Sequence, residues 1–519
     1  MSHNEFTAAL GEVTSHLADR YNSLGSCAPV PPRSDIDSAL AALPSTLPAD
    51  GLGVTDTIQH LIDDITPGLL QGHAGSRFFG LVTGGVTPAS QLADILGSSS
   101  HPYTYSRIWL NPGKDASVAV ALEQRALDMV LDLLDIPRET FGGGSVTTGA
   151  TASNIMGLAC ARDALLLKSP HLPPNYNITE NGFPPPVSAG APAINVITVK
   201  AHGSILKAAA VTGIGRANVH DLPSAQPGPE DPWGLGLDIE KLEEQLRRAE
   251  EMGQGVIVVV TLGEVNTGGF TPHIRTISDL CKRHHAWLHI DAAFGGFAAL
   301  LPRYTYLSGE MALADSLTLD AHKWLNVPYD AAMFYTRHSS DLQRTFGPSP
   351  RLGTPAYLQV HTAPASPTEV SPNVLALREW HASLPSPLNC GIENSRRFRA
   401  LPLYAGLMEQ GKAGYAGWMS NPSHGGQWYT VVNADPTDSV PLNIILFRAK
   451  VNTPFPPSDA TATPRLLHAI NSQRLIYVTA TSWEGVGALR IAVSNWRTGL
   501  EGARDFEAVV EALSGAMRA

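Results

Sequence analysis

Short apolar runs alternate with helical patterns through the middle of this chain, and this alternation restricts the possible fold more than any other feature. The runs AINVITV (193–199), GVIVVVTL (255–262) and AWLHI (286–290) have the length and the branched side chains of buried strands. Helical periodicity fills the segments between such runs from about residue 91 to residue 390. The pattern predicts an α/β fold with helices on both faces of a mostly parallel sheet.

The flanking regions predict two further parts, as suits a chain of 519 residues. Residues 1–90 have helical periodicity broken by Pro and Gly, and this segment is too thin to fold alone. Residues 391–519 begin with a helical pattern, continue with PLNIILFRA, RLIYVTATSW and ALRIAVSNW, and end with a helix. We therefore expect a helical N-terminal segment (1–90), a large domain (91–390) and a small α+β C-terminal domain (391–519).

Charge and cysteine content restrict the class of function. Lys and Arg total 36 against 47 Asp and Glu, and the net charge of -11 argues against binding to nucleic acid or an anionic membrane. The four cysteines are widely spaced without a metal-binding pattern, which favours reduced thiols and no metal site. The sequence has no basic and apolar leader and no apolar stretch near the ~18 residues of a membrane helix. These features predict a soluble cytoplasmic protein that acts on a small molecule.

The segment DAHKWLNVPYD (320–330) places Lys323 just after the end of a predicted buried strand. Residues 316–320 alternate polar and apolar side chains, and apolar residues follow the lysine without a turn that would expose it. A buried ammonium is costly unless it is paired or uncharged. A lysine that forms a Schiff base with pyridoxal phosphate avoids this cost, whereas a solvated surface lysine is the simpler alternative.

A glycine-rich turn opens an amphipathic helix in the segment GGGSVTTGATASN (142–154). Free N–H groups at the helix start, with the hydroxyls of Thr148, Thr151 and Ser153, suit a phosphate group. An ordinary capped helix is an equal alternative, because the sequence has neither a GxGxxG nor a Walker pattern.

Asp291, in HIDAAFGGF (289–297), ends the predicted strand AWLHI at the edge where open α/β sheets bind ligands. A carboxylate there could keep the pyridine nitrogen of the cofactor protonated, although a helix cap or a hydrogen-bonded buried aspartate is an alternative. Lys323 follows 32 residues later (323 − 291), which leaves room for one helix and one strand and predicts both residues at the same sheet edge. His202 follows the run AINVITV, and a buried structural histidine is its simpler interpretation.

Five ordered motifs, TTGATASN, KAHGSILKAA, HIDAAFGG, DAHKW and SRRFRAL, resemble the pyridoxal-phosphate-dependent decarboxylases of the aromatic-amino-acid and glutamate decarboxylase group. The resemblance extends from RFFGLVTGG (77–85) to ALRIAVSNW (488–496). It implies an aminotransferase-like fold with a mostly parallel seven-stranded sheet, and an obligate homodimer with active sites at the subunit interface, where the N-terminal segment packs. The implied reaction converts an L-amino acid to its amine and carbon dioxide, with pyridoxal 5'-phosphate as cofactor.

The resemblance also implies a role for each matching residue. Lys323 would be the aldimine lysine, Asp291 the partner of the pyridine nitrogen, and His202 the residue stacked on the ring. Tyr357, in TPAYLQVH (354–361), would donate the proton to the carbanion, unless it is only an exposed loop residue. Trp109 would contact the substrate, and the other cofactor contacts would be Ala150, Thr151, Ala293 and His322.

Three departures from the family pattern bear on substrate and cofactor. Glu264, in GEVNTGG, replaces the first threonine of a Gly-Thr-Thr turn, and it could recognise a cationic substrate or pair with an arginine. Asp320 replaces an asparagine at the cofactor phosphate, and its charge would repel that group unless neutralised. Leu81 and Val82 stand where aromatic substrate contacts are usual, so we expect weak activity on tryptophan and dihydroxyphenylalanine relative to a smaller aliphatic or cationic amino acid.

Three other functions fit the same sequence. An aldehyde synthase would let the carbanion react with oxygen, an outcome that goes with Phe at the tyrosine position in plant relatives. A carbon–carbon lyase of the sphingosine-phosphate lyase type would release an aldehyde without carbon dioxide. An inactive homodimeric relative would have no turnover, and the intact Lys323, Asp291 and His202 argue against it.

Overall fold

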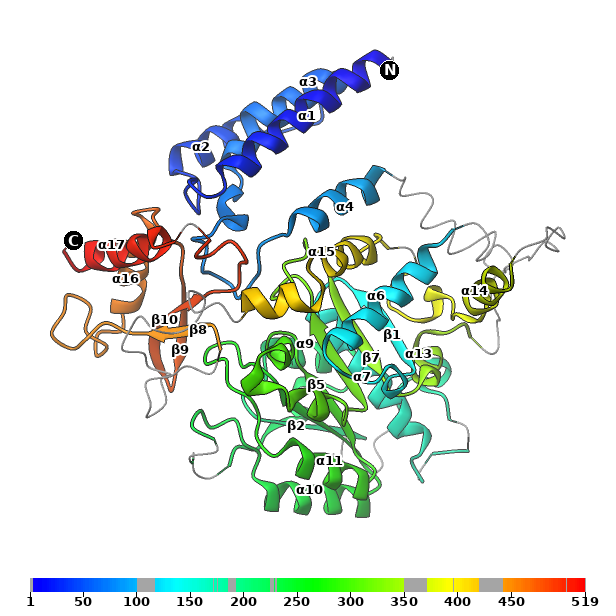
Figure 1. Cartoon of the computed structure of the whole chain (residues 1–519). Coiled ribbons are helices and arrows are strands. Elements are labelled where there is room, and N and C mark those ends of the chain that lie inside the picture. Colours follow the sequence, from blue (N-terminus) through cyan, green and yellow to red (C-terminus); the bar gives the residue numbers. More distant parts are fainter. Residues whose placement is uncertain are drawn as a thin grey trace. The chain divides into compact units, whose positions relative to one another are not determined.

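The computed structural model describes residues 3–99, 117–170, 172–174, 176–184, 193–224, 228, 231–349, 371–394, 396–419, 442–500 and 502–518. The chain forms two compact units (Figure 1). The terminal unit is Met1–Val86 with Asn421–Ala519, and the sheet unit is Thr87–Ser420. Residues 391–420, which we expected in the C-terminal domain, belong to the sheet unit.

A seven-stranded sheet forms the centre of the sheet unit. Its strands lie in the order β1 (Gly143–Thr147), β7 (Ala332–Thr336), β6 (Ser316–Asp320), β5 (Trp287–Asp291), β4 (Gly255–Thr261), β2 (Ile194–Thr198) and β3 (Val219–Asp221). Strand β7 runs antiparallel to β1 and β6, and the remaining pairings are parallel. The mostly parallel seven-stranded sheet is thus confirmed, and β2 and β4 lie within the apolar runs 193–199 and 255–262.

Every residue of β5 and β6 is buried, so both faces of this sheet are covered by other parts of the chain. The helices of the sheet unit are α4 (Pro88–Ser99), α6 (Ala119–Leu133), α7 (Ala150–Leu167), α8 (Ile178–Asn181), α9 (Gly203–Val211), α10 (Ile239–Glu251), α11 (Ile274–Arg283), α12 (Leu307–Met311), α13 (Ser339–Phe346), α14 (Pro372–Ser383) and α15 (Ala400–Met419).

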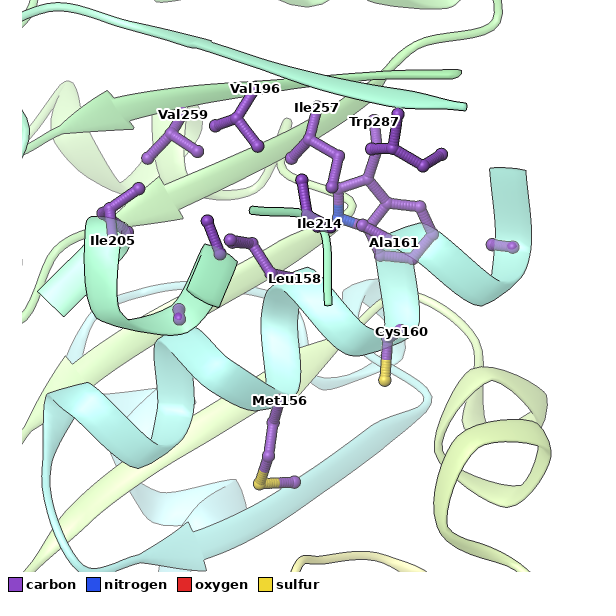
Figure 2. Close-up of a cluster of buried hydrophobic side chains, with 14 of the residues drawn as sticks. Met156, Leu158, Cys160, Ala161, Val196, Ile205, Ile214, Ile257, Val259 and Trp287 are labelled. Atoms are coloured by element: carbon purple, nitrogen blue, oxygen red, sulfur yellow. The ribbon is translucent and has the colours of Figure 1, made fainter. Parts of the chain in front are cut away.

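Helix α7 packs on one face of the sheet and positions its own first turn at the sheet edge. Met156 and Leu158 of α7 share one buried cluster with Ile257 and Val259 of β4 (Figure 2). Trp287 of β5 belongs to the same cluster. Fully burying such a side chain contributes roughly 1.5–3 kcal/mol, so this contact holds α7 firmly against the strands.

The opposite face is covered in part by the 3-10 helix η7 (Gly295–Leu300) that follows β5. A Cβ atom added to Gly296 would lie 2.6 Å from the Leu319 side chain of β6. Only glycine therefore lets the chain after Asp291 pass so close to the neighbouring strand. This close approach fixes the path of the chain directly beyond the end of β5.

The terminal unit combines N-terminal helices with a small antiparallel sheet. Its helices are α1 (His3–Ser23), α2 (Arg33–Ala42), α3 (Gly53–His60), α16 (Ala462–Asn471) and α17 (Arg504–Arg518), and its strands lie in the order β8 (Ile444–Phe447), β10 (Val486–Ala492) and β9 (Thr479–Trp483). Ile445 and Ile491 on the strands and Ile470 and Ala512 on the helices share one buried cluster. The alternating pattern of the C-terminal sequence thus reflects a half-covered sheet.

None of the described helices is both long enough and apolar enough to span a membrane. The described residues also contain no group of three or more His, Cys, Asp or Glu side chains placed to hold a metal ion.

Candidate active site

The candidate site lies at the carboxyl edge of two neighbouring parallel strands. Asp291 is the last residue of β5 and Asp320 is the last residue of β6. The two strands pair in parallel, with Asp291 opposite Thr318. Lys323 follows Asp320 by three residues, so Lys323 and Asp291 are at the same edge, as their spacing predicted.

Asp291 is a buried carboxylate with hydrogen bonds on both oxygens. Asp291 is only 5% exposed. The amide Nδ2 of Asn154 donates to Oδ2 over 2.8 Å, and the backbone N–H of Ala293 donates to Oδ1 over 3.2 Å. An ionised carboxylate has about four acceptor positions, so two remain for a protonated ring nitrogen.

His202 is tied to the same cluster from another element. It caps the N-terminus of α9, where its Nδ1 accepts the backbone N–H of Ser204 over 3.2 Å and lies 2.9 Å from the Ser204 hydroxyl. That hydroxyl lies 3.0 Å from Nδ2 of Asn154, the atom that also donates to Asp291. Asn154 therefore brings the predicted ring-stacking histidine and the predicted ring-nitrogen partner into one site.

Asp320 caps the first turn of α7, where the sequence predicts a phosphate site. Its Oδ2 accepts the backbone N–H of Ala150 over 3.3 Å, and its Oδ1 accepts the backbone N–H of His322 over 3.2 Å. Nδ1 of His322 lies 3.1 Å from Oδ1 of Asp320. The half-buried Thr148 and Thr151 lie at the same turn, and the positive end of a helix suits an anion there.

Lys323 and His322 form the part of the site that follows β6. Lys323 is half-buried, and no residue that the structure describes forms a hydrogen bond or ion pair with its Nζ. His322 is buried, and its ring stacks on Tyr329 with centroids 3.9 Å apart. Burial lowers the pKa of His322, the Asp320 carboxylate opposes that shift, and the Lys323 charge adds to it.

Glu264 has a local partner that the sequence did not predict. Its carboxylate accepts the backbone N–H groups of Asn266 and Thr267 over 3.0 and 2.8 Å, and it also accepts both of their side-chain donors. Glu264 is only 5% exposed. The described hydrogen bonds of this carboxylate thus stabilise the turn in which Glu264 lies, and none of them involves an arginine.

The remaining predicted residues are distributed differently. Ala293 lies next to Asp291 and is buried. Leu81 and Val82 belong to the terminal unit, have φ values of 68° and 52°, and differ in exposure, with Leu81 60% and Val82 2% exposed. Trp109 and Tyr357 lie outside the described residues.

The sequence analysis did not single out Asn154, Ser204 or His289. Asn154 stands in the TTGATASN motif, and Ser204 stands two residues after His202. His289 precedes Asp291 by two residues, so strand alternation places both on the same face of β5. Polar residues on faces that pack in the core are the signal by which all three could have been found.

His289 predicts a pH dependence of stability. It is fully buried, and burial lowers its pKa from 6.5 to about 4, against an opposing effect of Asp291. The unfolded chain therefore binds a proton between these values that the folded chain does not bind, so stability is complete above pH 6.5 and falls as the pH decreases toward 4. We expect His289 alone to lower the free energy of unfolding by about 3 kcal/mol between pH 7 and pH 4.

Urea unfolding at both pH values measures this loss. Carboxylates also titrate in this range, so the informative quantity is the difference between the wild type and His289→Gln, which cannot be protonated. Equal losses in the two proteins would mean that the neutral state of His289 does not contribute to the pH dependence.

The fold is a large α/β unit with a cluster of polar side chains at the carboxyl edge of its sheet. Residues 38–430 match the family described as the pyridoxal-dependent decarboxylase conserved domain, and the chain belongs to this family. It is therefore a pyridoxal-phosphate-dependent carboxy-lyase that acts on an amino acid. The half-buried amine of Lys323, which has no hydrogen-bonding or ion-pairing partner among the described residues, fits this cofactor, as do the buried Asp291 carboxylate and the first turn of α7.

The relatives have several different substrates. Aromatic-L-amino-acid decarboxylase of Rattus norvegicus is 24% identical over 507 residues, covering 95% of this chain and 94% of that protein. L-2,4-diaminobutyrate decarboxylase of Acinetobacter baumannii is 30% identical over 302 residues, covering 56% of this chain and 53% of that protein. The structure of Oryza sativa TDC with PLP and tryptamine has a TM-score of 0.75 at 21% identity, covering 100% of this chain and 99% of that one.

Proposed function

We propose that this chain converts an L-amino acid to the corresponding amine and carbon dioxide. The observation that supports the proposal most is the polar cluster at the carboxyl edge of the sheet. There Asp291 is connected through Asn154 and Ser204 to His202, and Lys323 follows the end of the adjacent strand. Asp291, His202 and Lys323 thus come from three different parts of the sheet unit: the end of β5, the start of α9 and the segment after β6.

We propose a role for each group at this edge of the sheet. Lys323, which is half-buried, would anchor the cofactor covalently through its amine, and His202 would lie against the ring. Pyridoxal phosphate, when bound, supplies an electron sink for the electron pair left by the departing carboxylate. The Asp291 carboxylate would lie beside the ring nitrogen, and its burial would strengthen that interaction because the dielectric constant is low there.

The first turn of α7 is the proposed phosphate site. The backbone N–H groups from Ala150 onward, with the hydroxyls of Thr148 and Thr151, would donate to the phosphate. Asp320 already accepts one of these N–H groups, so its charge must be compensated when the phosphate binds. His322 lies 3.1 Å from Asp320, but its lowered pKa favours the neutral ring, so the phosphate site must obtain this compensation from another group.

Tyr357 is the proposed donor of the proton that replaces the carboxylate. A phenol is a competent general acid when it reaches the reacting carbon. With this donor in place, protonation is faster than reaction with oxygen, so the amine is the product.

A homodimer is the proposed assembly. Helix α4 exposes large apolar side chains on its surface, with Leu92 and Leu96 62% and 61% exposed and Ile95 41% exposed. Such a cluster is expected where a second copy covers it. Sedimentation equilibrium measures the mass of the assembly.

All four cysteines are free, which agrees with the expected cytoplasmic location.

A panel of L-amino acids tests the proposed function. Carbon dioxide, amine, ammonia and aldehyde should be measured together, and we expect amine and carbon dioxide in equal amounts with little ammonia or aldehyde. We also expect weaker activity on tryptophan and dihydroxyphenylalanine than on a small aliphatic or cationic amino acid. This preference now depends on Leu81 and Val82, since the described contacts of Glu264 are within its own turn.

Each alternative function gives a different result in this panel. Aldehyde, ammonia and carbon dioxide together would indicate oxidative deamination. Aldehyde without carbon dioxide would indicate a carbon–carbon lyase, and no turnover of any amino acid by cofactor-loaded protein would indicate an inactive relative. A clear preference for an aromatic amino acid would contradict the proposed substrate class and leave the reaction type intact.

A further inference from the structure

A chain of buried polar side chains extends from the interior of the sheet unit to Asp291. The indole Nε1 of Trp287 lies 2.8 Å from Oγ of Ser316, which lies 2.8 Å from Nδ1 of His289. Nε2 of His289 lies 2.9 Å from Oδ1 of Asn154, whose Nδ2 lies 2.8 Å from Oδ2 of Asp291. All five residues are buried, so water does not substitute for these partners.

The direction of every hydrogen bond in this chain is fixed by its two ends. An indole N–H only donates, so Ser316 receives that bond and donates its own proton to Nδ1 of His289. A carboxylate only accepts, so the NH₂ group of Asn154 faces Asp291 and its carbonyl oxygen faces His289. His289 must therefore be neutral and carry its proton on Nε2.

The position of the His289 ring is enforced by packing as well as by hydrogen bonds. The ring lies directly against Gly157 of α7, and a Cβ atom added there would lie 2.5 Å from Cε1 of His289. Such a contact is shorter than real Cβ contacts, so any other residue at position 157 would displace the ring. His289, on β5, is held in one orientation by atoms of two other elements, α7 and β6.

Asn154 is the branch point of the chain. Its amide group has two N–H bonds, and its Nδ2 is 2.8 Å from Asp291 and 3.0 Å from Oγ of Ser204. Ser204 in turn contacts Nδ1 of His202 through its hydroxyl and its backbone N–H. A backbone N–H only donates, so Nδ1 of His202 is an acceptor and the ring proton is on Nε2.

We propose that His289 and Asn154 are positioning residues that fix the Asp291 carboxylate and the His202 ring relative to each other. This inference rests on the proposed roles of Asp291 and His202. Rotation of the Asn154 amide would break both of its donor bonds at once, so the orientation of the two cofactor-binding groups depends on a single amide. His289 opposes that rotation, because its Nε2–H donates to the Asn154 carbonyl and would face the Asn154 NH₂ group after rotation.

Two substitutions at His289 separate a positioning role from simple packing. His289→Gln can place an amide N–H near the position of Nε2 and retain the bond to Asn154, whereas His289→Leu fills similar space without a donor. For His289→Leu we expect pyridoxal phosphate to bind the apo-protein about tenfold more weakly, because Asn154 is then no longer held in place to donate to the charged Asp291. We expect His289→Gln to remain within about twofold of the wild type.

Two readouts accompany the binding measurement. The visible absorption of bound cofactor, titrated against pH, should change its midpoint in His289→Leu and not in His289→Gln, because only the former releases Asn154 from Asp291. Ser316→Ala should give a smaller change in the same direction, since it removes the donor that fixes the His289 tautomer. Ser278→Ala, a buried serine of α11 outside the chain of hydrogen bonds, is the matched control and should leave the titration unchanged.

A glycine substitution tests the same inference with every polar group still present. Gly157→Ala should displace the His289 ring and reproduce the absorption change of His289→Leu. Gly309→Ala, on an exposed helix position with no atom within 4 Å of the added Cβ, should have no effect. If His289→Leu does not fold, Gly157→Ala and Ser316→Ala still test the proposal.

Equal cofactor affinity and equal absorption titrations in the wild type, His289→Leu and Gly157→Ala would overturn the inference. Asp291→Asn distinguishes this from failure of the proposed function. If Asp291→Asn alters the absorption and the His289 variants do not, Asp291 keeps its role and the positioning by His289 is wrong. If Asp291→Asn also behaves as the wild type, the proposed role of Asp291 is itself wrong.

Discussion

Replacing Lys323 with alanine is expected to abolish turnover and the visible absorption of the covalently bound cofactor. The alanine has no amine to form the link. Lys323 is half-buried, and its Nζ has no hydrogen-bonding or ion-pairing partner among the described residues, so the amine is available for that link in the wild type. Pyridoxal phosphate should still bind through its phosphate at the first turn of α7. Absorption spectra and borohydride reduction followed by mass measurement test both expectations.

Lys207→Ala is the matched control for this experiment. Lys207 is an exposed lysine of α9, in the same motif as His202, and its loss should leave the covalent link and the turnover intact. A borohydride-reducible link that persists in Lys323→Ala would identify a different anchor and refute the assignment. The pair thus separates loss of one specific amine from loss of positive charge near the site.

The sequence predicted the sheet unit well because its strands carry their own signal. β2, β4 and β5 consist of apolar or alternating residues whose length and branching are typical of buried strands. The 32-residue spacing correctly predicted that Asp291 and Lys323 share a sheet edge, since it allows only one crossover. To predict this part of the fold, it was enough to combine local periodicity with the rule that alternating strands and helices form a parallel sheet.

The hydrogen-bonding partners of the site residues were beyond the reach of such patterns. Asn154 and Asp291 are separated by 137 residues, and only the packing of α7 on β5 brings them within 2.8 Å. Glu264 shows the opposite limit, because its partners are two and three residues away in a turn whose backbone geometry the sequence did not specify. In both cases the sequence motif is compatible with several hydrogen-bonding partners for the charged residue, and the three-dimensional fold determines which donors it binds.

The grouping of α15 into the sheet unit has a similar explanation. Helical periodicity predicts a helix in NSRRFRALPLYAGLMEQG (394–411), where the structure has α15 (Ala400–Met419) with a kink at Gly411, but it does not say which neighbour buries the apolar side of that helix. In the structure Tyr415 of this helix donates to the backbone oxygen of Leu325, two residues after Lys323, over 3.3 Å. That bond links α15 to the chain segment that carries the predicted anchor.

Replacing Asp291 with asparagine is expected to preserve the fold and lower kcat by about 10²- to 10³-fold, the effect of losing a well-placed charge interaction in a buried site. Both oxygens of Asp291 accept hydrogen bonds, from Asn154 and from the backbone of Ala293. An asparagine has only one acceptor, so its NH₂ group must face one of these donors. The variant therefore loses the charge and also one hydrogen bond that fixes the side chain.

Single-turnover and steady-state rates on the preferred substrate test this expectation, and circular dichroism tests the fold. Asp315→Asn is the matched control, because Asp315 is a half-buried aspartate at the other end of β6 that accepts the backbone N–H of Leu288 over 2.8 Å. The substitution removes a carboxylate charge next to the same sheet but leaves the carboxyl edge untouched, so kcat should stay near the wild-type value. A rate for Asp291→Asn close to that of Asp315→Asn would mean that the ring nitrogen does not depend on this carboxylate, and the electron sink would then have to be stabilised by another group.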